Sequence, residues 1–204
     1  MKVLDGFARR RERKKKAIIE AAQNLFFRNG VKQSGIADIA REANVSQVTI
    51  YNYFGNKEGL VREVVLQLME AKWQEFEELI SSELPFPEKI EEMVASKNQT
   101  TRDFEKAEFL DPVFFQDPVV REYIDRFYRE RTIPSVRKLI SQGRKEGYLP
   151  PFISDEAILA YLARFKDMAQ DQEMMAPENK KLRQDITYLF FYGLFGSKPG
   201  GRKN

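Results

Sequence analysis

The stretch from Ile36 to Leu60, IADIAREANVSQVTIYNYFGNKEGL, constrains the fold more than any other part of the chain. Apolar residues such as Ile39 and Ile50 recur at helical spacing on either side of Asn44. Asn tolerates the left-handed backbone of a tight interhelical turn better than most residues. Ser46 can cap the following helix, because its hydroxyl can accept a hydrogen bond from an amide two or three residues on. The pattern predicts a helix-turn-helix.

Helical spacing of apolar residues continues on both sides of this stretch. Residues 14–29 are predicted to form a preceding helix that stops at Gly30, and residues 57–80 a long following one. Proline and capping residues mark later helix starts near Pro87, Pro118, Ser154 and Pro177. Strand-like alternation is absent from the sequence. We therefore expect an all-α chain, with a three-helix helix-turn-helix domain over residues 1–60 and a larger helical domain over residues 61–204.

The charge is placed unevenly along the chain. Seven of the eight residues from Arg9 to Lys16 are basic. Residues 1–60 hold 12 Lys or Arg against 6 Asp or Glu, whereas residues 61–204 hold 22 against 25. The excess of positive charge therefore lies in the expected helix-turn-helix domain, as attraction to DNA phosphates requires.

Composition excludes several classes of function. The chain has no cysteine and no histidine, which excludes disulfides, thiolate metal sites and catalytic triads that use histidine. No run approaches the length of a membrane span, and the N-terminus lacks the apolar region of a signal peptide. We expect a cytoplasmic protein without a cofactor, a metal site or a membrane partner.

Residues 39–60 resemble the TetR family of bacterial transcriptional repressors. The matching residues are IADIAREANVS and TIYNYFGNKEGL, and the resemblance covers roughly residues 12–62. Beyond them the chain shares only the family's general plan of a basic arm, a helix-turn-helix, a long connecting helix and a helical remainder. The resemblance implies a homodimer that binds a palindromic operator in double-stranded DNA and responds to a small-molecule effector.

The resemblance also implies which residues contact DNA. Gln47, Val48 and Thr49 match positions that meet base edges or nearby backbone, and Val48 and Thr49 could also touch thymine methyl groups. Tyr51, Tyr53 and Lys57 match positions that contact phosphates, and Asn52 could reach the backbone or a base. The full expected set is Ser46, Gln47, Val48, Thr49, Tyr51, Asn52, Tyr53 and Lys57, together with Arg13 and Lys14 of the basic arm.

Three positions depart from the family pattern. Asn44 stands where the family usually has glycine, a change of small expected cost. Gly35 stands where a helix-capping, phosphate-binding threonine is common, and Ala37 where some members carry a base-reading side chain. Base recognition should therefore depend mainly on residues 47–52.

The last helix predicts a dimer interface. From Ile186 onward its residues are apolar nearly all round, and one chain rarely buries both faces of its terminal helix. The resemblance implies the same interface, formed by helices over about residues 154–176 and 177–195. The expected interface residues are Ile186, Tyr188, Phe191, Tyr192 and Phe195.

The resemblance further implies an effector cavity in the C-terminal domain, where a small apolar or aromatic ligand would release the protein from its operator. An aromatic stripe at helical spacing is also what an ordinary core shows. The residues expected to line the cavity are Trp73, Phe76, Phe109, Tyr123, Phe127, Tyr161, Phe165 and Met168.

Alternatives remain open at this point. The same DNA-binding domain could serve an activator or a regulator without an effector. A helical enzyme could use a carboxylate pair such as Glu105 and Glu108, or Asp167 and Asp171, as metal ligands, although no Glu-x-x-His motif accompanies them. A third alternative is a protein whose basic arm binds a membrane surface or a protein partner.

Overall fold

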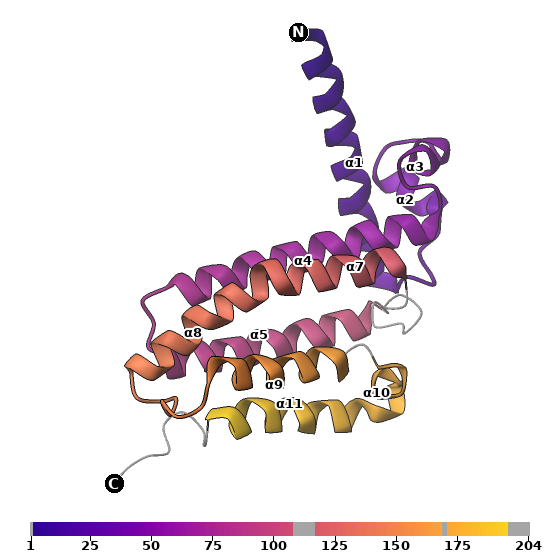
Figure 1. Cartoon of the computed structure of the whole chain (residues 1–204). Coiled ribbons are helices and arrows are strands. Elements are labelled where there is room, and N and C mark those ends of the chain that lie inside the picture. Colours follow the sequence, from indigo (N-terminus) through magenta and orange to yellow (C-terminus); the bar gives the residue numbers. More distant parts are fainter. Residues whose placement is uncertain (1, 108–116, 169–170, 196–204) are drawn as a thin grey trace. The chain divides into compact units, whose positions relative to one another are not determined.

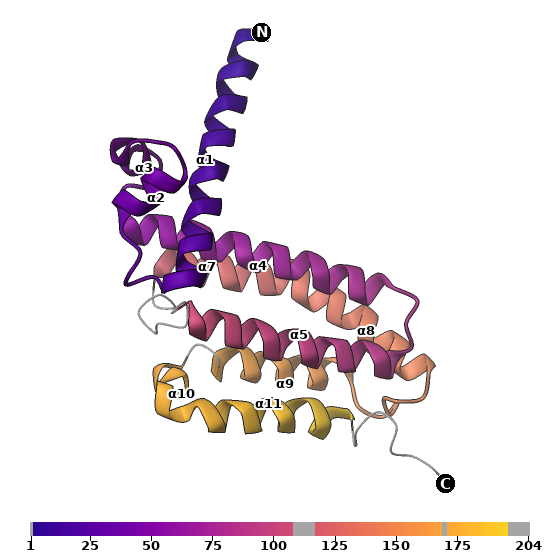
Figure 2. The same cartoon turned by 180° about the vertical axis from the view of Figure 1, so that it is seen from behind.

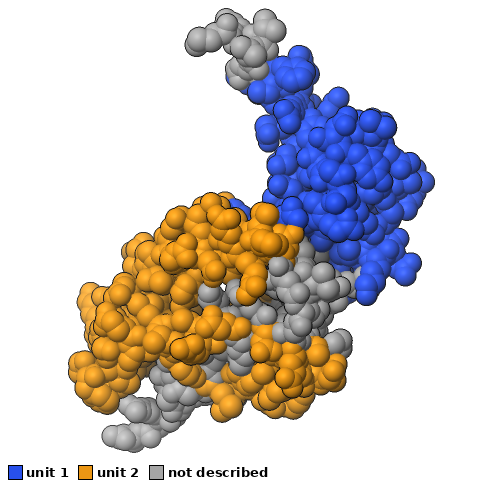
Figure 3. Space-filling view, turned by 45° about the vertical axis from the view of Figure 1, so that its right-hand side comes forward, with its two compact units in different colours: residues 1–72, 101–109 blue, residues 73–100, 110–204 orange. Residues whose placement is uncertain are grey.

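The structure, a computed structural model, describes residues 2–107, 117–168 and 171–195. All regular secondary structure in these ranges is helical, which confirms the all-α prediction (Figure 1). The chain divides into two compact units, one of residues 1–72 and 101–109 and one of residues 73–100 and 110–204 (Figure 3). The boundary expected after residue 60 stays a prediction. Within the described ranges, no helix is both long and apolar enough to cross a bilayer.

The N-terminal unit contains the helix-turn-helix. Its elements are α1 (Lys2–Asn29), α2 (Ile36–Glu42), α3 (Gln47–Phe54) and the first part of α4 (Lys57–Ser81). Gly30 ends α1 with φ 82°, as the sequence predicted. The core of this unit is fully buried and apolar, with inward residues from every helix: Ile18, Ile19, Ala22, Phe26, Ile39, Ile50, Leu60 and Val64.

Helix α1 is longer than the apolar pattern predicted. The pattern begins near Lys14, whereas the structure is helical from Lys2. The preceding segment is rich in Arg, Lys and Glu and contains no proline, and these residues have good helix propensity without needing a core. The basic segment of Arg9 to Lys16 is therefore part of a continuous helix, which extends beyond α2 and α3 in both views (Figures 1 and 2).

The C-terminal unit is a layered helical bundle. It contains the end of α4, most of α5 (Phe86–Lys106), α7 (Pro118–Phe127), α8 (Ile133–Lys145), α9 (Asp155–Met168), α10 (Gln172–Met175) and α11 (Lys180–Phe195). Asp117 caps α7 by accepting hydrogen bonds from the Val119 and Val120 amides, and Ser154 caps α9, as predicted. A separate α10 and a 3-10 turn (Pro177–Asn179) interrupt the two long terminal helices that the sequence predicted.

The chain stays helical through Pro134, although a proline at such a position usually breaks or kinks a helix. A π-helical segment, Tyr128–Thr132, joins α7 to α8, and Pro134 is the second residue of α8. Proline has no amide hydrogen and its ring crowds the preceding turn. The wider π-helical turn just before Pro134 accommodates that change while the chain remains helical.

A cluster of buried apolar side chains holds α5, α8 and α9 together. Phe86 of α5 is 1% exposed and packs with Ile140 of α8 and Ile158 of α9, among others. Gly143 makes this contact possible, because a Cβ there would lie 2.7 Å from the Phe86 ring. Gly143 lies in the last turn of α8, which ends at Lys145, and it is buried.

A polar network closes one end of this unit. The Lys89 ammonium, 2% exposed, donates to the Ile80 carbonyl (2.6 Å) in the last turn of α4 and to the Gln142 side-chain oxygen (2.9 Å). A cation is favourable beside the carbonyls that end a helix. The Glu146 carboxylate accepts from the Gln142 amide (2.7 Å) and from the Phe86 main-chain amide (2.8 Å) at the start of α5.

Glu146 should make stability depend on pH in the acid range. The hydrogen bond from Gln142, and then that from the Phe86 amide, lower the pKa of Glu146 below its ordinary value of 4.5. A lowered pKa in the folded state stabilises the protein above pH 4.5, and this contribution is lost as pH falls through the folded-state value. We therefore expect Glu146→Gln to flatten the fall in the free energy of unfolding below that pH, measured by urea denaturation. Glu91→Gln, on the exposed side of α5, is the control and should keep the wild-type slope; equal slopes for both variants would contradict the assignment.

Candidate nucleic-acid interface

The turn between α2 and α3 has the predicted geometry. Asn44 adopts the left-handed conformation with φ 53°, and within the described ranges no other residue except glycine has a positive φ. The Ser46 hydroxyl accepts a hydrogen bond from the Thr49 amide at 3.1 Å and lies 2.8 Å from the Thr49 hydroxyl. Ser46 therefore caps α3 as predicted, and its hydroxyl is engaged by hydrogen bonds in the first turn of that helix.

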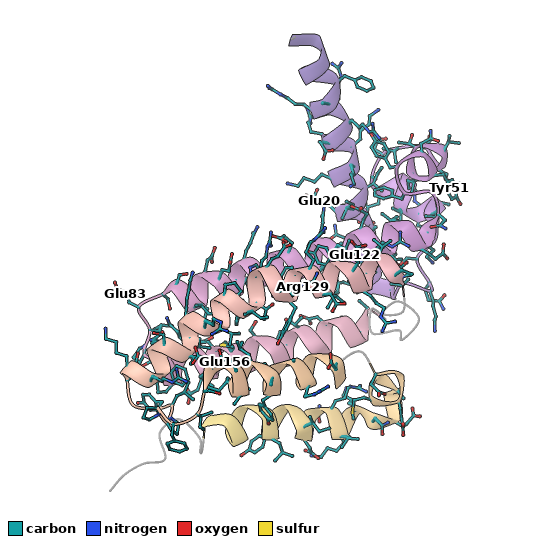
Figure 4. All side chains as sticks on the ribbon, viewed as in Figure 1. Glu20, Tyr51, Glu83, Glu122, Arg129 and Glu156 are labelled. Atoms are coloured by element: carbon teal, nitrogen blue, oxygen red, sulfur yellow. The ribbon has the colours of Figure 1, made fainter. Side chains whose placement is uncertain are left out.

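Helix α3 presents one face to the core and another to solvent. Ile50 is fully buried, whereas Val48 is 65% and Tyr51 45% exposed. Gln47 and Asn52 are also exposed. Figure 4 shows Tyr51 at the outer edge of the helix-turn-helix. A large apolar side chain and an aromatic ring held in solvent on a short, capped helix form a surface suited to base edges and methyl groups.

Lys57 lies at the start of α4 and is only half exposed. Its ammonium lies 3.5 Å from the Lys32 carbonyl oxygen, the distance of a weak hydrogen bond, close to the first turn of the helix. Asn56 caps the same turn by accepting from the Gly59 amide at 2.7 Å. The amides of a helix N-terminus and a nearby cation together favour an anion such as a phosphate.

Tyr53 makes an intramolecular contact that the sequence did not predict. Its hydroxyl donates to the main-chain carbonyl of Arg11 in α1 at 3.2 Å, and the Arg11 guanidinium lies 5.7 Å from the centre of its ring. Tyr53 thus ties α3 to the basic segment of α1. The expected DNA residues Arg13 and Lys14 are exposed on that segment.

A groove of about 910 Å³ lies between the basic segment of α1 and the α2–α3 turn. Its basic side chains come from α1, its apolar surface from Ala17, Ala43 and Val45, and its α3 side from Asn52 and Tyr53. Arg10, Arg11, Arg13, Lys14 and Lys16 make it strongly positive. The structure thus places Arg13, Lys14, Asn52 and Tyr53 around one groove, and Gln47, Val48 and Tyr51 outside it.

Four of the residues expected to line an effector cavity form one aromatic cluster. The Trp73 ring lies 4.9 Å from those of Phe76 and Phe127, and the Tyr123 ring 5.7 Å from that of Phe127. The Trp73 indole nitrogen is buried and has no hydrogen-bond partner among the described residues. Tyr161 is 43% exposed. Phe109 and the side chains of Phe165 and Met168 lie outside the described part of the chain.

The structure describes the side chains of only two of the five expected dimer residues. Ile186 is half-buried, and Tyr188 is 54% exposed. The side chains of Phe191, Tyr192 and Phe195 lie outside the described set. Leu182 and Leu189 of α11 are also exposed, at 45% and 63%.

The carboxylate pairs proposed as metal ligands receive no support from the described residues. Asp171 caps α10 through the Met174 amide, and Asp167 lies 3.6 Å from Arg164. Among the described side chains, no three carboxylates gather where they could hold a metal ion. Glu108 and the side chain of Glu105 lie outside that set.

Sequence reasoning missed Gly59, Asn56 and Arg11 as parts of this site. A Cβ on Gly59 would lie 2.1 Å from the Phe54 carbonyl oxygen, so glycine allows the end of α3 to meet the start of α4. A glycine in the first turn of a predicted helix, after an asparagine, was the available signal for the first two. The role of the Arg11 carbonyl could not be predicted from the sequence, because every residue has a main-chain carbonyl.

Comparison with known proteins agrees with this geometry. Residues 18–64 match the model for bacterial regulatory proteins of the tetR family. A relative in Bacillus subtilis (strain 168), the uncharacterized HTH-type transcriptional regulator YhgD, is 29% identical over 171 residues, which cover 80% of this chain and 86% of the relative.

Solved structures share the fold over most of the chain. FadR from Bacillus subtilis in complex with stearoyl-CoA is 18% identical with a TM-score of 0.58, over 87% of this chain and 98% of that one. FadR from Thermus thermophilus, a TetR family repressor in complex with lauroyl-CoA, is 20% identical with a TM-score of 0.56, over 93% of this chain and all of that one (100%).

Proposed function

We propose that this chain, which belongs to the TetR family of bacterial transcriptional regulators, is a homodimeric repressor that a small apolar ligand releases from a palindromic operator. The observation that carries the DNA-binding part is the exposed face of α3. Val48 and Tyr51 stand in solvent on a helix whose opposite side, at Ile50, is fully buried. Recognition helices in a dimer would enter successive major grooves of the operator.

The residues expected to contact DNA would have different roles, according to how exposed each one is. Gln47, Val48 and Tyr51 would meet base edges and the adjacent backbone, since they are exposed at the outer edge of the unit. Thr49 is half-buried and engaged with Ser46, which leaves its methyl group for a thymine contact. Lys57 would bind a phosphate together with the first amides of α4.

The experiment for this function is selection of bound duplexes from a randomised pool by the full-length protein. The expected result is an inverted repeat whose binding weakens steeply as salt rises, because bound phosphates release counterions. Failure to enrich any sequence would overturn sequence-specific recognition. Cytoplasmic localisation, which access to chromosomal DNA requires, is part of the same proposal.

The dimer would form through α9 and α11. These helices lie side by side, and neither view shows a described segment on the outer side of α11 (Figures 1 and 2). Exposed Leu182, Tyr188 and Leu189 would be covered by a second copy of the chain. Apolar side chains gathered on one helix are typical of such permanent interfaces.

Leu189→Glu should therefore convert the dimer to a monomer. Leu189 is 63% exposed in the single chain, so the substitution should leave the fold intact while it places a charge in the interface. Light scattering after size exclusion would measure the mass, with Gln184→Glu, also on an exposed position of α11, as the control. A monomeric wild type, or a variant that remains dimeric, would contradict the assignment.

The effector would bind near the aromatic cluster of Trp73, Phe76, Tyr123 and Phe127. These rings offer apolar surface, and the unpaired Trp73 indole offers one hydrogen-bond donor. The two FadR structures hold fatty acyl thioesters, so fatty acyl-CoA is the first ligand class to test. A ligand that binds one conformation only would shift the dimer away from DNA. Quenching of Trp73 fluorescence, together with release of a bound duplex, is the expected response.

A further inference from the structure

The groove beside α1 differs from the exposed face of α3 in both shape and charge. Helix α3 has no charged side chain, whereas the groove is concave and carries five basic side chains against one glutamate. Apolar Ala17, Ala43 and Val45 line the same groove. Apolar and cationic surface side by side matches a polymer of sugars and phosphates.

Several of the cations in this groove are available to a ligand. Lys15, just outside it, is 2.8 Å from Glu63, and Lys16 is 3.7 Å from Glu20, so both have internal partners. Arg10, Arg13 and Lys14 are exposed, and none of them forms an ion pair with another described residue. Together with Arg11, whose guanidinium lies over the Tyr53 ring, they supply the positive charge of the groove that no described carboxylate neutralises.

Tyr53 fixes the position of this charge relative to α3. Its hydroxyl bonds to the Arg11 carbonyl at 3.2 Å, so the contact grips the backbone of α1 and not a mobile side chain. The Arg11 guanidinium covers the ring at 5.7 Å, which adds a cation–π attraction. Because α1 is helical through this point, holding Arg11 also orients Arg10, Arg13 and Lys14.

We propose that the groove binds the DNA sugar–phosphate backbone beside the bases read by α3, and that Tyr53 is the positioning residue that holds α1 in place for it. This inference rests on the proposed function and extends it to a second contact surface. Charge complementarity selects the occupant, and the groove shares Asn52 and Tyr53 with the recognition helix. The backbone that enters the groove is therefore continuous with the half-site in contact with α3.

The first test compares the wild type with a triple variant, Arg10→Gln, Arg13→Gln and Lys14→Gln, on two duplexes. One is the duplex selected from a randomised pool with long flanks, and the other is the same duplex trimmed to its inverted repeat. On the long duplex the slope of log K against log salt should become shallower by about 2 to 3 per protomer, since each lost phosphate contact removes about 0.9. On the trimmed duplex the two proteins should differ much less.

A wild type that binds neither duplex would overturn the proposed function and this inference with it. A wild type that binds the long duplex with the same salt slope as the triple variant would overturn only the inference. Anisotropy of a labelled duplex gives both affinities. Thermal melting of the triple variant should match the wild type, because the three side chains are exposed.

The second test separates positioning by Tyr53 from direct phosphate contact. Tyr53→Phe keeps the ring under Arg11 and removes only the hydroxyl that holds the α1 backbone. We expect roughly a fivefold loss of affinity on the long duplex, the size of one lost hydrogen bond. The same substitution in the triple variant should have almost no further effect. An equal loss in both backgrounds would mean that Tyr53 acts independently of the basic segment and would overturn its positioning role.

Discussion

Gly59→Ala is expected to lower the free energy of unfolding of the N-terminal unit by about 3 kcal/mol. The added Cβ would lie 2.1 Å from the Phe54 carbonyl oxygen and 3.2 Å from its carbon. Both atoms belong to the backbone at the end of α3, so no side chain can rotate away to make room. The start of α4 would have to move, and the 2.7 Å cap between Asn56 and the Gly59 amide would be lost with it.

Two other glycines provide graded controls for this effect. Gly6→Ala in α1 meets nothing within 4 Å, and should be neutral or slightly stabilising because alanine favours a helix. Gly143→Ala would press on the buried Phe86 ring at 2.7 Å; because side chains and not backbone stand in the way, its cost should fall between the other two. Urea denaturation followed by circular dichroism, at one protein concentration, gives the order. A Gly59→Ala variant as stable as the wild type would show that α3 and α4 do not meet as described.

Local patterns predicted most of the helices because each depends on residues close in sequence. The Ser46 and Asp117 caps, the left-handed Asn44 and the stop at Gly30 all follow from preferences of one residue and its neighbours. The start of α1 was missed for a physical reason. Apolar spacing marks only the part of a helix that needs a core, and the basic segment before Lys14 has none.

The groove could not be predicted in the same way. Its defining contact joins Tyr53 to Arg11, 42 residues apart, and uses a main-chain carbonyl that any residue would supply. Resemblance to the family assigned Tyr53 to phosphate, whereas its hydroxyl here bonds to α1. The π-helical segment before Pro134 is similar, since the proline predicts a disturbance and only the packed helices decide its form. Tertiary placement, not residue type, determines such features.

Val48→Glu is expected to abolish sequence-specific DNA binding while leaving the fold unchanged. Val48 is 65% exposed, and exposed substitutions usually change stability by less than about 0.5 kcal/mol. On DNA the new carboxylate would face base acceptors and phosphates, and the contact between the valine methyls and a thymine would be lost. Each wrong contact costs about 1 to 3 kcal/mol, and a dimer carries two copies. The affinity for the selected duplex should therefore fall about a hundredfold or more.

Comparison with Val48→Thr separates the effect of the new charge in Val48→Glu from the effect of a changed side-chain shape. Threonine keeps one methyl group and is neutral, so binding should weaken by less than about tenfold and shift the preferred base beside it.

Binding to DNA of random sequence at low salt distinguishes the contribution of the α3 face from that of the groove beside α1. It depends on phosphate contacts, and Arg10, Arg13 and Lys14 remain in place in both variants. Val48→Glu should therefore lose its preference for the selected duplex before it loses affinity for DNA of random sequence. If Val48→Glu bound the selected duplex as tightly as the wild type, α3 would not be the element that enters the major groove.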